Sequence, residues 1–271
     1  MEVTFERDGR QYSFETCSDT DFLVYRLRKY SRFYEQDLLY YSKRLIEALE
    51  FDSGLIVDCG ANIGNHSVFW GTHTPLQILA IEANPPVAGC LQRNMKRNLK
   101  PGTFQAISGG VGETSGWGDV KFPESSEDQP VLARVEPVAG PSATTIEIQP
   151  VPVWIERANL SHLPVRILKI DIEGLEMEVL RGAKSILERD KPELFLEAGT
   201  PAHQQRLDEL LTPLGYNRLK RFCTTPTWHF TTLTDASLRQ RLWLAGIHER
   251  LRWRFHKMQN SLQSRMSRKA A

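Results

Sequence analysis

Acidic residues and glycines occur along this sequence at a spacing that suits a nucleotide-like ligand. Asp58 ends a short apolar run and is followed by Gly60 and Gly64, while Glu82 ends a second apolar run. A glycine at position 60 can adopt positive φ and lets the backbone approach a ligand, and the helix expected after Gly64 begins with free N–H groups. A carboxylate placed like Glu82 accepts both hydroxyls of a ribose in dinucleotide-binding folds.

Two further acids end later apolar runs, and we predict a catalytic role for them. A hydroxyl is a poor nucleophile until its proton is removed, and Asp171 is the candidate base for that step. A second ligand contact, or an N-cap for the helix expected from Glu173, stays open for Asp171. Glu197 is expected to assist Asp171, and such a pair could also bind a divalent cation, although no metal is expected. His66, early in the helix after Gly64, is a third catalytic candidate or simply a polar helix residue.

The pattern around the glycine turn distinguishes between two classes of cofactor. A nicotinamide site uses Gly-x-Gly-x-x-Gly to bring a pyrophosphate onto the helix N-terminus, but Asn62 and Asn65 occupy this segment. Asp58 would repel a pyrophosphate and suits a ligand with cationic groups. S-adenosylmethionine carries an ammonium and a sulfonium, so the pattern favours S-adenosylmethionine.

We predict a contact to the cofactor for each of seven residues. Glu35 and Asp58 are expected at the methionine amino end, although Glu35 could instead lie on a solvated helix face. Asn84 is expected beside the adenine, or as the N-cap of a helix starting at Pro85. The full predicted set is Glu35, Asp58, Gly60, Asn62, Gly64, Glu82 and Asn84.

Apolar runs alternate with helical patterns over most of the chain, which predicts an α/β fold with a doubly wound sheet. Strands are expected at 55–58, 77–81, 103–107, 165–171 and 193–197, with an antiparallel pair at 215–219 and 228–232. Helices are expected at 31–50, from about 65, at 84–98, 173–189 and 204–211. We divide the chain into a hairpin and helix covering the site (1–50), the main domain (51–235) with an inserted β/loop segment (113–150), and a helical tail (236–271).

Composition and charge limit the function classes. The chain has 41% hydrophobic and 25% charged residues and a formal net charge of +1, which is typical of a soluble globular protein and gives no reason to expect nucleic-acid binding. The four cysteines are far apart, so neither a disulfide framework nor a zinc site is expected, and a reducing, cytoplasmic location fits. The N-terminal residues do not resemble a signal peptide.

The tail is basic and amphipathic. Residues 239–271 contain nine lysines or arginines against one acid, Glu249, and Leu251, Phe255, Met258 and Leu262 form one stripe. A helix packed on the body, peripheral docking on an anionic membrane surface and homodimerisation are the three interpretations.

Several of these segments resemble the FkbM-type methyltransferases. The similar blocks are 33–35, 55–69, 80–85, 168–183 and 192–197, and 168–183 is the most distinctive. The resemblance implies a Rossmann-like class I methyltransferase fold: a seven-stranded, mostly parallel sheet with an antiparallel last strand and helices on both faces. It also implies S-adenosylmethionine-dependent methylation of an oxygen, commonly a hydroxyl of a sugar, glycan or natural product.

The chain departs from the family pattern at residues 108–112, where the family tends to carry an acid and this sequence has none before Glu113. Two other functions stay open. One is a nicotinamide-dependent oxidoreductase, and the other is a catalytically silent protein that keeps the fold and acts as an adapter at a membrane.

Overall fold

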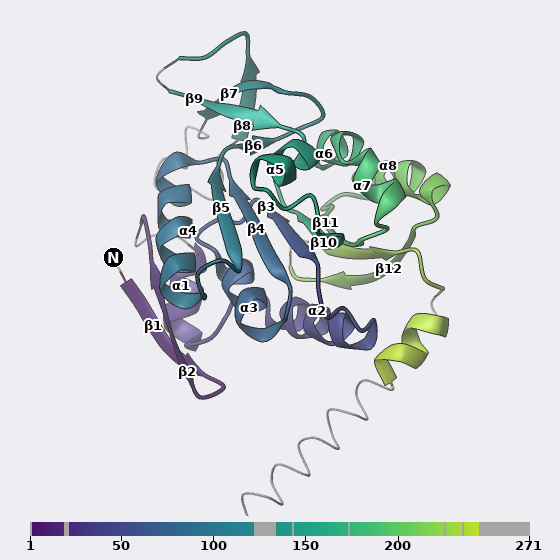
Figure 1. Ribbon diagram of the computed structural model, residues 1–271, viewed down its shortest axis with the longest axis horizontal. Helices are drawn as coiled ribbons and strands as arrows, with labels where there is room; N and C mark the ends of the chain where they lie inside the picture. The colour runs from purple at the N-terminus through teal and green to yellow at the C-terminus, as the bar shows by residue number, and fades with distance from the viewer. Residues whose placement is uncertain are drawn as a thin grey trace, which may run out of the picture.

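A seven-stranded sheet forms the centre of the molecule, in the order β12-β13-β11-β10-β3-β4-β5 (Figure 1). The computed structural model describes residues 2–18, 22–121, 134–142, 144–172, 174–224, 226–234 and 236–243. Strand β13 is antiparallel to both its neighbours and all other pairs are parallel, which confirms the predicted sheet. The strands are β3 (Leu55–Cys59), β4 (Gln77–Glu82), β5 (Phe104–Ser108), β10 (Val165–Ile170), β11 (Glu193–Glu197), β12 (Asn217–Phe222) and β13 (Thr227–Thr231).

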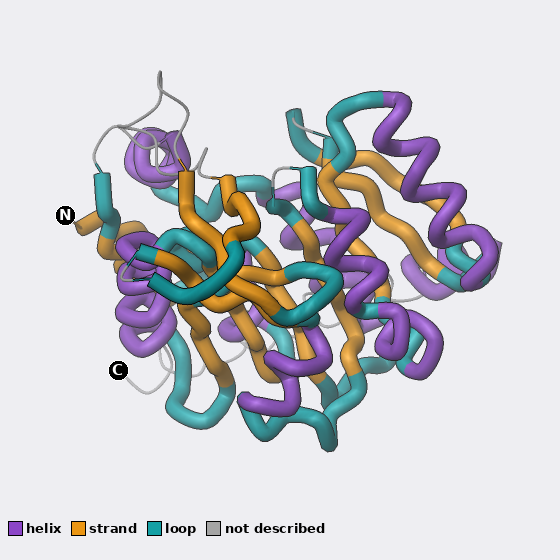
Figure 2. Tube along the Cα trace, turned by 90° about the horizontal axis from the view of Figure 1, so that it is seen from above, coloured by secondary structure: helices purple, strands orange, loops and turns teal. Residues whose placement is uncertain are grey.

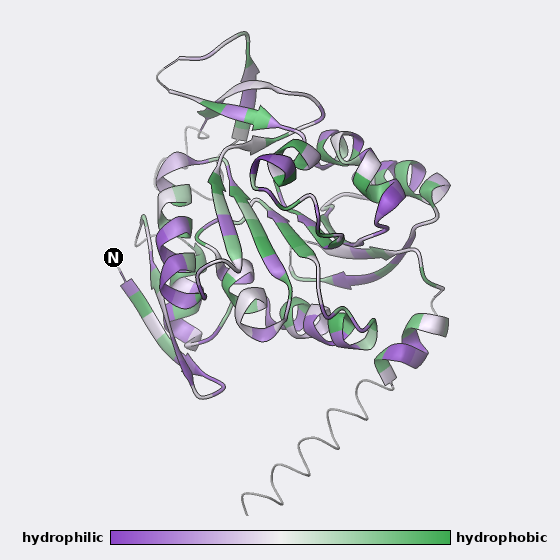
Figure 3. Ribbon diagram, in the orientation of Figure 1, coloured by the Kyte–Doolittle hydropathy of each residue, from purple (hydrophilic) through white to green (hydrophobic). Residues whose placement is uncertain are grey.

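Helices cover both faces of this sheet, as Figure 2 shows from above. Side chains alternate along a buried strand, so Ile56 packs into the core on one face while Leu55 and Val57 pack into the core on the other. In Figure 3 the central strands β3 and β4 are largely hydrophobic, whereas the edge strand β12 is largely hydrophilic. The first face carries α1 (Phe22–Tyr30), α2 (Gln36–Ala48), α3 (Asn65–His73) and α4 (Pro85–Asn98), and the second carries α5 (Val151–Arg157), α6 (Glu176–Gly182), α7 (Lys184–Arg189) and α8 (Pro201–Leu211).

An N-terminal hairpin, β1 (Glu2–Arg7) and β2 (Arg10–Glu15), packs against α4. Its inward-facing aromatic side chains, including Phe5 and Phe14, surround Phe33. The side-chain amides of Asn94 and Asn98 on α4 bond to backbone groups of β2. The hairpin is therefore fixed to the same helix that begins just after Glu82.

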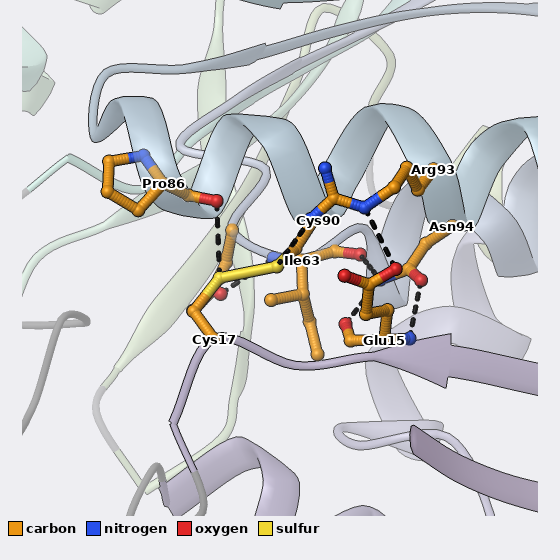
Figure 4. The surroundings of a disulfide bond; sticks show 8 residues. Glu15, Cys17, Ile63, Pro86, Cys90, Arg93 and Asn94 are labelled. Atoms are coloured by element: carbon orange, nitrogen blue, oxygen red, sulfur yellow. Dashed lines mark hydrogen bonds and ion pairs between the residues drawn. A yellow bond between two sulfur atoms is a disulfide. The ribbon is translucent and has the colours of Figure 1, made fainter. Parts of the chain in front are cut away.

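A disulfide joins Cys17, just after the hairpin, to Cys90 on α4 (Figure 4). No disulfide framework was expected from the cysteine spacing, and this single pair was not predicted. Cysteines 73 positions apart in the sequence give no signal of proximity, and the hairpin's packing on α4 brings them together. The bond holds the chain close to α4 at the point where it runs on towards α1.

The helix expected over 31–50 begins later, and a separate helix, α1, precedes it. Residues Phe33, Tyr34 and Glu35 form a turn between the two helices, and Glu35 adopts a left-handed conformation with φ of 56°. The side chain of Asn65 accepts the Tyr34 N–H (2.9 Å) and donates to the Tyr34 carbonyl (3.2 Å). Tertiary contacts thus fix this turn, which a helical pattern alone does not reveal.

The segment after β5 forms a second, four-stranded sheet in the order β6-β9-β7-β8. Its strands are β6 (Gly110–Val111), β7 (Gly116–Lys121), β8 (Arg134–Val138) and β9 (Thr145–Gln149). Within the inserted β/loop segment predicted over 113–150, the sequence favours short strands at 131–135 and 144–148, near β8 and β9, but it gives no signal for β6, β7 or helix α5. The Trp154 indole on α5 donates to the Gly110 carbonyl (2.9 Å), which connects the second sheet to the main body.

The helix expected over 173–189 is two helices, α6 and α7, that meet at Ala183. Gly182 lies against the loop at Gly112, and a Cβ added at Gly182 would be 2.3 Å from the Gly112 carbonyl oxygen. Residue 173 is outside the described part of the chain. Residues 236–243 are helical, and the apolar stripe expected in the tail lies outside the described residues. Among the residues described, no helix has the length and apolar character needed to cross a membrane.

Candidate active site

A cavity of about 320 Å³ lies at the carboxyl ends of β3, β4, β10 and β11. Ligands of open α/β sheets bind at this edge. The cavity is also lined by Phe22, Leu23 and Tyr34 from the N-terminal segment and by Val135 from the second sheet. Of the ten predicted site residues, seven line it: Glu35, Gly60, Asn62, His66, Glu82, Asp171 and Glu197. Asp58, Gly64 and Asn84 do not.

Glu82 is held in place by the turn that follows β3. Its Oε2 accepts the Asn62 N–H (2.9 Å) and its Oε1 accepts the Asn84 N–H (2.9 Å). Burial raises the pKa of Glu82 above its ordinary value, although these two N–H groups stabilise the charged form. The carboxylate therefore presents a hydrogen-bond acceptor to the cavity in a fixed position.

The two glycines of the turn have different steric roles. Gly60 has φ of +76°, and a Cβ there would lie 1.9 Å from the carbonyl oxygen of Asp171. Gly60 therefore lets the ends of β3 and β10 come together. Gly64, at the N-cap of α3, packs towards Leu91 on α4 instead of facing the cavity. Asn84 occupies the N-cap position of α4.

Asp58 lies behind the cavity wall, which differs from the expectation of a direct ligand contact. It is fully buried, and its Oδ2 accepts the Ser67 hydroxyl (2.7 Å). Its Oδ1 is 3.3 Å from Nζ of Lys169, the residue opposite it on β10. The same Nζ is 3.1 Å from Oδ2 of Asp171. Burial alone would lower the pKa of Lys169, but the two aspartates outweigh it and raise the pKa.

Asp171 and Glu197 lie close enough on the wall for their side chains to interact by a hydrogen bond. Burial alone would raise the pKa of Asp171, but the Lys169 ammonium and the hydrogen bond from Glu197 lower it to about 2. A carboxylate of such low pKa is a weak base at neutral pH, so the acidity of Asp171 does not favour the general-base role predicted for it.

Glu35 and His66 form a second polar pair on the wall, with Oε2 and Nε2 3.1 Å apart. Burial alone would raise the pKa of Glu35, but His66 outweighs it and lowers the pKa. The His66 ring stacks on Trp70, one helical turn along α3. The cavity wall thus carries two carboxyl groups of lowered pKa, Asp171 and Glu35, together with the His66 ring.

Sequence reasoning missed the apolar part of the wall and the residues that position the polar part. Asn65, which clamps the turn before Glu35, and Tyr34 belong to blocks that resemble the family, but nothing in their types indicated these contacts. Another histidine near the sheet edge, His203, has its Nε2 3.4 Å from the buried Glu176, and neither residue lies on the cavity wall. No cluster suited to a metal ion occurs within the described ranges.

Comparison with known proteins gives two curated relatives. The chain is 30% identical over 155 residues to the hexuronic acid methyltransferase AglP of Haloferax volcanii, a match that covers 57% of this chain and 58% of the relative. It is 31% identical over 150 residues to Methyltransferase 1 of Beauveria bassiana, covering 48% of this chain and 59% of that protein. The chain thus spans less than two thirds of either relative.

A solved structure and a protein family also match. The methyltransferase FkbM from Methylobacillus flagellatus is 20% identical, with a TM-score of 0.46, over 66% of this chain and 44% of that chain. The family described as methyltransferase FkbM domain matches residues 58–218, which is more than half of the chain. This protein therefore belongs to the FkbM methyltransferase domain family.

Proposed function

We propose that this protein is an S-adenosylmethionine-dependent O-methyltransferase that acts on a hydroxyl group of a sugar or of another hydroxylated small molecule. The observation that carries the proposal is the placement of Glu82, a cavity carboxylate held by two backbone N–H groups beside the glycine turn. Membership of the FkbM methyltransferase family supports the reaction class.

The cavity walls fit the proposed cofactor. Glu82 would accept the ribose hydroxyls, and Glu35 would face the cationic methionine end. The cation on the wall, Lys169, is already paired with two aspartates. An acidic cavity would repel a pyrophosphate, so its charge disfavours the nicotinamide alternative. When bound, S-adenosylmethionine supplies an electrophilic methyl group on sulfur.

The remaining polar wall would act on the acceptor. The Asp171 carboxylate would accept a hydrogen bond from the acceptor hydroxyl and hold its oxygen in line for transfer, so positioning supplies much of the acceleration. Proton removal would fall to His66, because Asp171 and Glu35 both have lowered pKa values. The curated relative named as a hexuronic acid methyltransferase supports a sugar as the acceptor.

Calorimetric titration with S-adenosylhomocysteine and with NAD tests the cofactor assignment. We expect S-adenosylhomocysteine to bind and NAD not to bind. Glu82→Gln should weaken S-adenosylhomocysteine about 10- to 100-fold, since it replaces charge-assisted hydrogen bonds of about 1.5–3 kcal/mol. The exposed Glu188→Gln is the control and should leave the affinity unchanged.

The pH dependence of binding gives a second readout. Glu82 accepts hydrogen bonds best when ionised, and its pKa is raised. Affinity of the wild type should therefore fall as the pH is lowered through that raised pKa, and Glu82→Gln should lack this fall. Tight NAD binding, or an unchanged affinity in Glu82→Gln, would refute the cofactor assignment. Labelled methyl transfer to sugars then tests the acceptor class.

A further inference from the structure

A second hollow of about 390 Å³ adjoins the cavity, and Phe22, Tyr34 and Glu35 line both. It is formed by α1, the start of α2 and the turn after β12. Its remaining lining residues are Arg26, Tyr30, Arg32, Phe33, Gln36, Asp37, Leu38, Cys223 and Thr224. A molecule in this hollow therefore lies one side chain away from the cofactor cavity.

Arg26 is surrounded by aromatic rings in this hollow. Its guanidinium carbon is 4.7 Å from the ring centre of Tyr30, 5.5 Å from that of Phe22 and 5.7 Å from that of Tyr34. Its Nε is buried and makes no hydrogen bond, and no carboxylate in the described parts of the chain pairs with it. Cation–π contacts thus hold the guanidinium in place, and its buried Nε has no hydrogen-bond partner among the described residues.

A second unused donor lies in the same hollow, because Gln36 Nε2 is also buried without a hydrogen-bond partner. Buried polar groups are nearly always satisfied, so two unsatisfied donors in one hollow indicate a ligand acceptor. Arg32 adds a further cation, with its guanidinium carbon 5.3 Å from the Tyr30 ring centre.

The two acids of the hollow leave these cations available. Glu35 lies at the boundary with the cavity, where His66 is 3.1 Å away. Asp37 is exposed in the first turn of α2, and within the ranges described no ion pair joins it to either arginine. The hollow therefore combines aromatic faces, two guanidinium groups and a boundary carboxylate.

We propose that this hollow is the acceptor subsite and that it binds a sugar bearing an anionic group, either a carboxylate or a phosphate. Guanidinium groups bind both anions through paired N–H donors. The apolar face of the sugar ring packs against the Phe22 and Tyr30 rings, and its reacting hydroxyl extends past Glu35 at the boundary towards Asp171 in the cavity. The left-handed backbone of Glu35 is a strained conformation of the kind found at binding sites. The proposal rests on the proposed function, since the adjoining cavity is taken as the cofactor site.

NMR titrations of the full chain with S-adenosylhomocysteine bound test the proposal, with methyl glucuronide, glucose 1-phosphate and methyl glucoside as probes. We expect at least one anionic probe to bind at least ten-fold more tightly than the neutral glucoside, and the stronger of the two identifies the anion. Arg26→Met, which keeps the volume against the rings, should weaken that probe at least ten-fold. Arg26→Lys keeps the charge but loses Nε, and its affinity for that probe should lie between those of the wild type and Arg26→Met.

Controls separate this proposal from the cofactor assignment. The affinity for S-adenosylhomocysteine should change less than two-fold in Arg26→Met, which also shows that the variant folds. Arg44→Met, at an exposed position of α2 that lines neither hollow, should bind all probes like the wild type. Equal binding of anionic and neutral probes, no binding of any probe, or no effect of Arg26→Met would overturn the proposal. A wild type that fails to bind S-adenosylhomocysteine would instead overturn the proposed function.

Discussion

At the residue scale, Lys169 connects the buried and the exposed acids of the site. Its ammonium lies between Asp58, which is fully buried, and Asp171, whose side chain is 36% exposed. Parallel pairing of β3 and β10 places Lys169 opposite Asp58. The single cation therefore neutralises a charge in the core and keeps Asp171 ionised in the cavity.

Replacing this lysine should be costly. Lys169→Met would leave Asp58 buried without a counter-charge, and breaking a buried pair from one side costs about 3–5 kcal/mol. Urea unfolding should show this loss, while Lys184→Met, which removes an exposed lysine on α7, should change the free energy of unfolding by less than about 0.5 kcal/mol. Adding Asp58→Asn to Lys169→Met should recover part of the loss. Equal stabilities of the two lysine variants would contradict this role.

The sequence could predict acids that end strands, but it could not predict how each acid is paired. Asp58 and Asp171 both end apolar runs, so both were predicted to contact a ligand or substrate. Whether such a carboxylate is exposed depends on the neighbouring strand and helix, here Lys169 on β10 and Ser67 on α3. Glu82 differs because two backbone N–H groups hold it, one from Asn62 in the turn after β3 and one from Asn84 just after β4.

At the element scale, the turn after β3 has to fit against the end of β10. Gly60 and Gly102 both have positive φ, but only at Gly60 would a Cβ meet another backbone atom, whereas nothing lies within 4 Å at Gly102. Comparing alanine variants at Gly60 and Gly102 therefore distinguishes the cost of a left-handed backbone from the cost of a steric clash.

Alanine at these two glycines should have different effects. Gly102→Ala should cost about 1–2 kcal/mol, the penalty for a left-handed alanine. Gly60→Ala should cost more than about 4 kcal/mol, because the clash with the Asp171 carbonyl would push β3 and β10 apart. Chemical denaturation measures both, and S-adenosylhomocysteine affinity should fall only in Gly60→Ala. Similar losses of stability would show that the turn can relax around a methyl group.

Helices and strands that follow from a local sequence pattern were predictable. Features that depend on contacts with distant parts of the chain were not. The strands of the main sheet follow from apolar runs between turn residues. Helices α1 and α2 are separated by a turn that Asn65 clamps from another part of the chain, and Cys17 and Cys90 meet because the hairpin packs on α4. Strand β6 is two residues long, too short for a hydrophobic pattern to reveal.

At the scale of the whole molecule, three separate parts of the chain enclose the cavity. The sheet edge contributes Glu82 and Asp171, the N-terminal segment contributes Phe22 and Glu35, and the second sheet contributes Val135. The Cys17–Cys90 bond and the Asn65 clamp hold the N-terminal segment near the sheet edge. A ligand in the cavity should therefore stabilise all three parts together.

Hydrogen exchange with and without S-adenosylhomocysteine tests this enclosure. At a ligand concentration of 100 times Kd, binding to the folded state adds about 2.7 kcal/mol of stability. Amides that exchange by local opening should slow in residues 22–35, around Asn62 and Asn84, and in residues 104–121, since each of these contacts the cavity or supports its wall. Locally exchanging amides of α8, which does not line the cavity, should keep their rates and serve as the internal control. Protection confined to the glycine turn would mean that the N-terminal segment and the second sheet do not close around the ligand. If the locally exchanging amides of α8 slowed as much as those near the cavity, the response would be global and not set by the cavity.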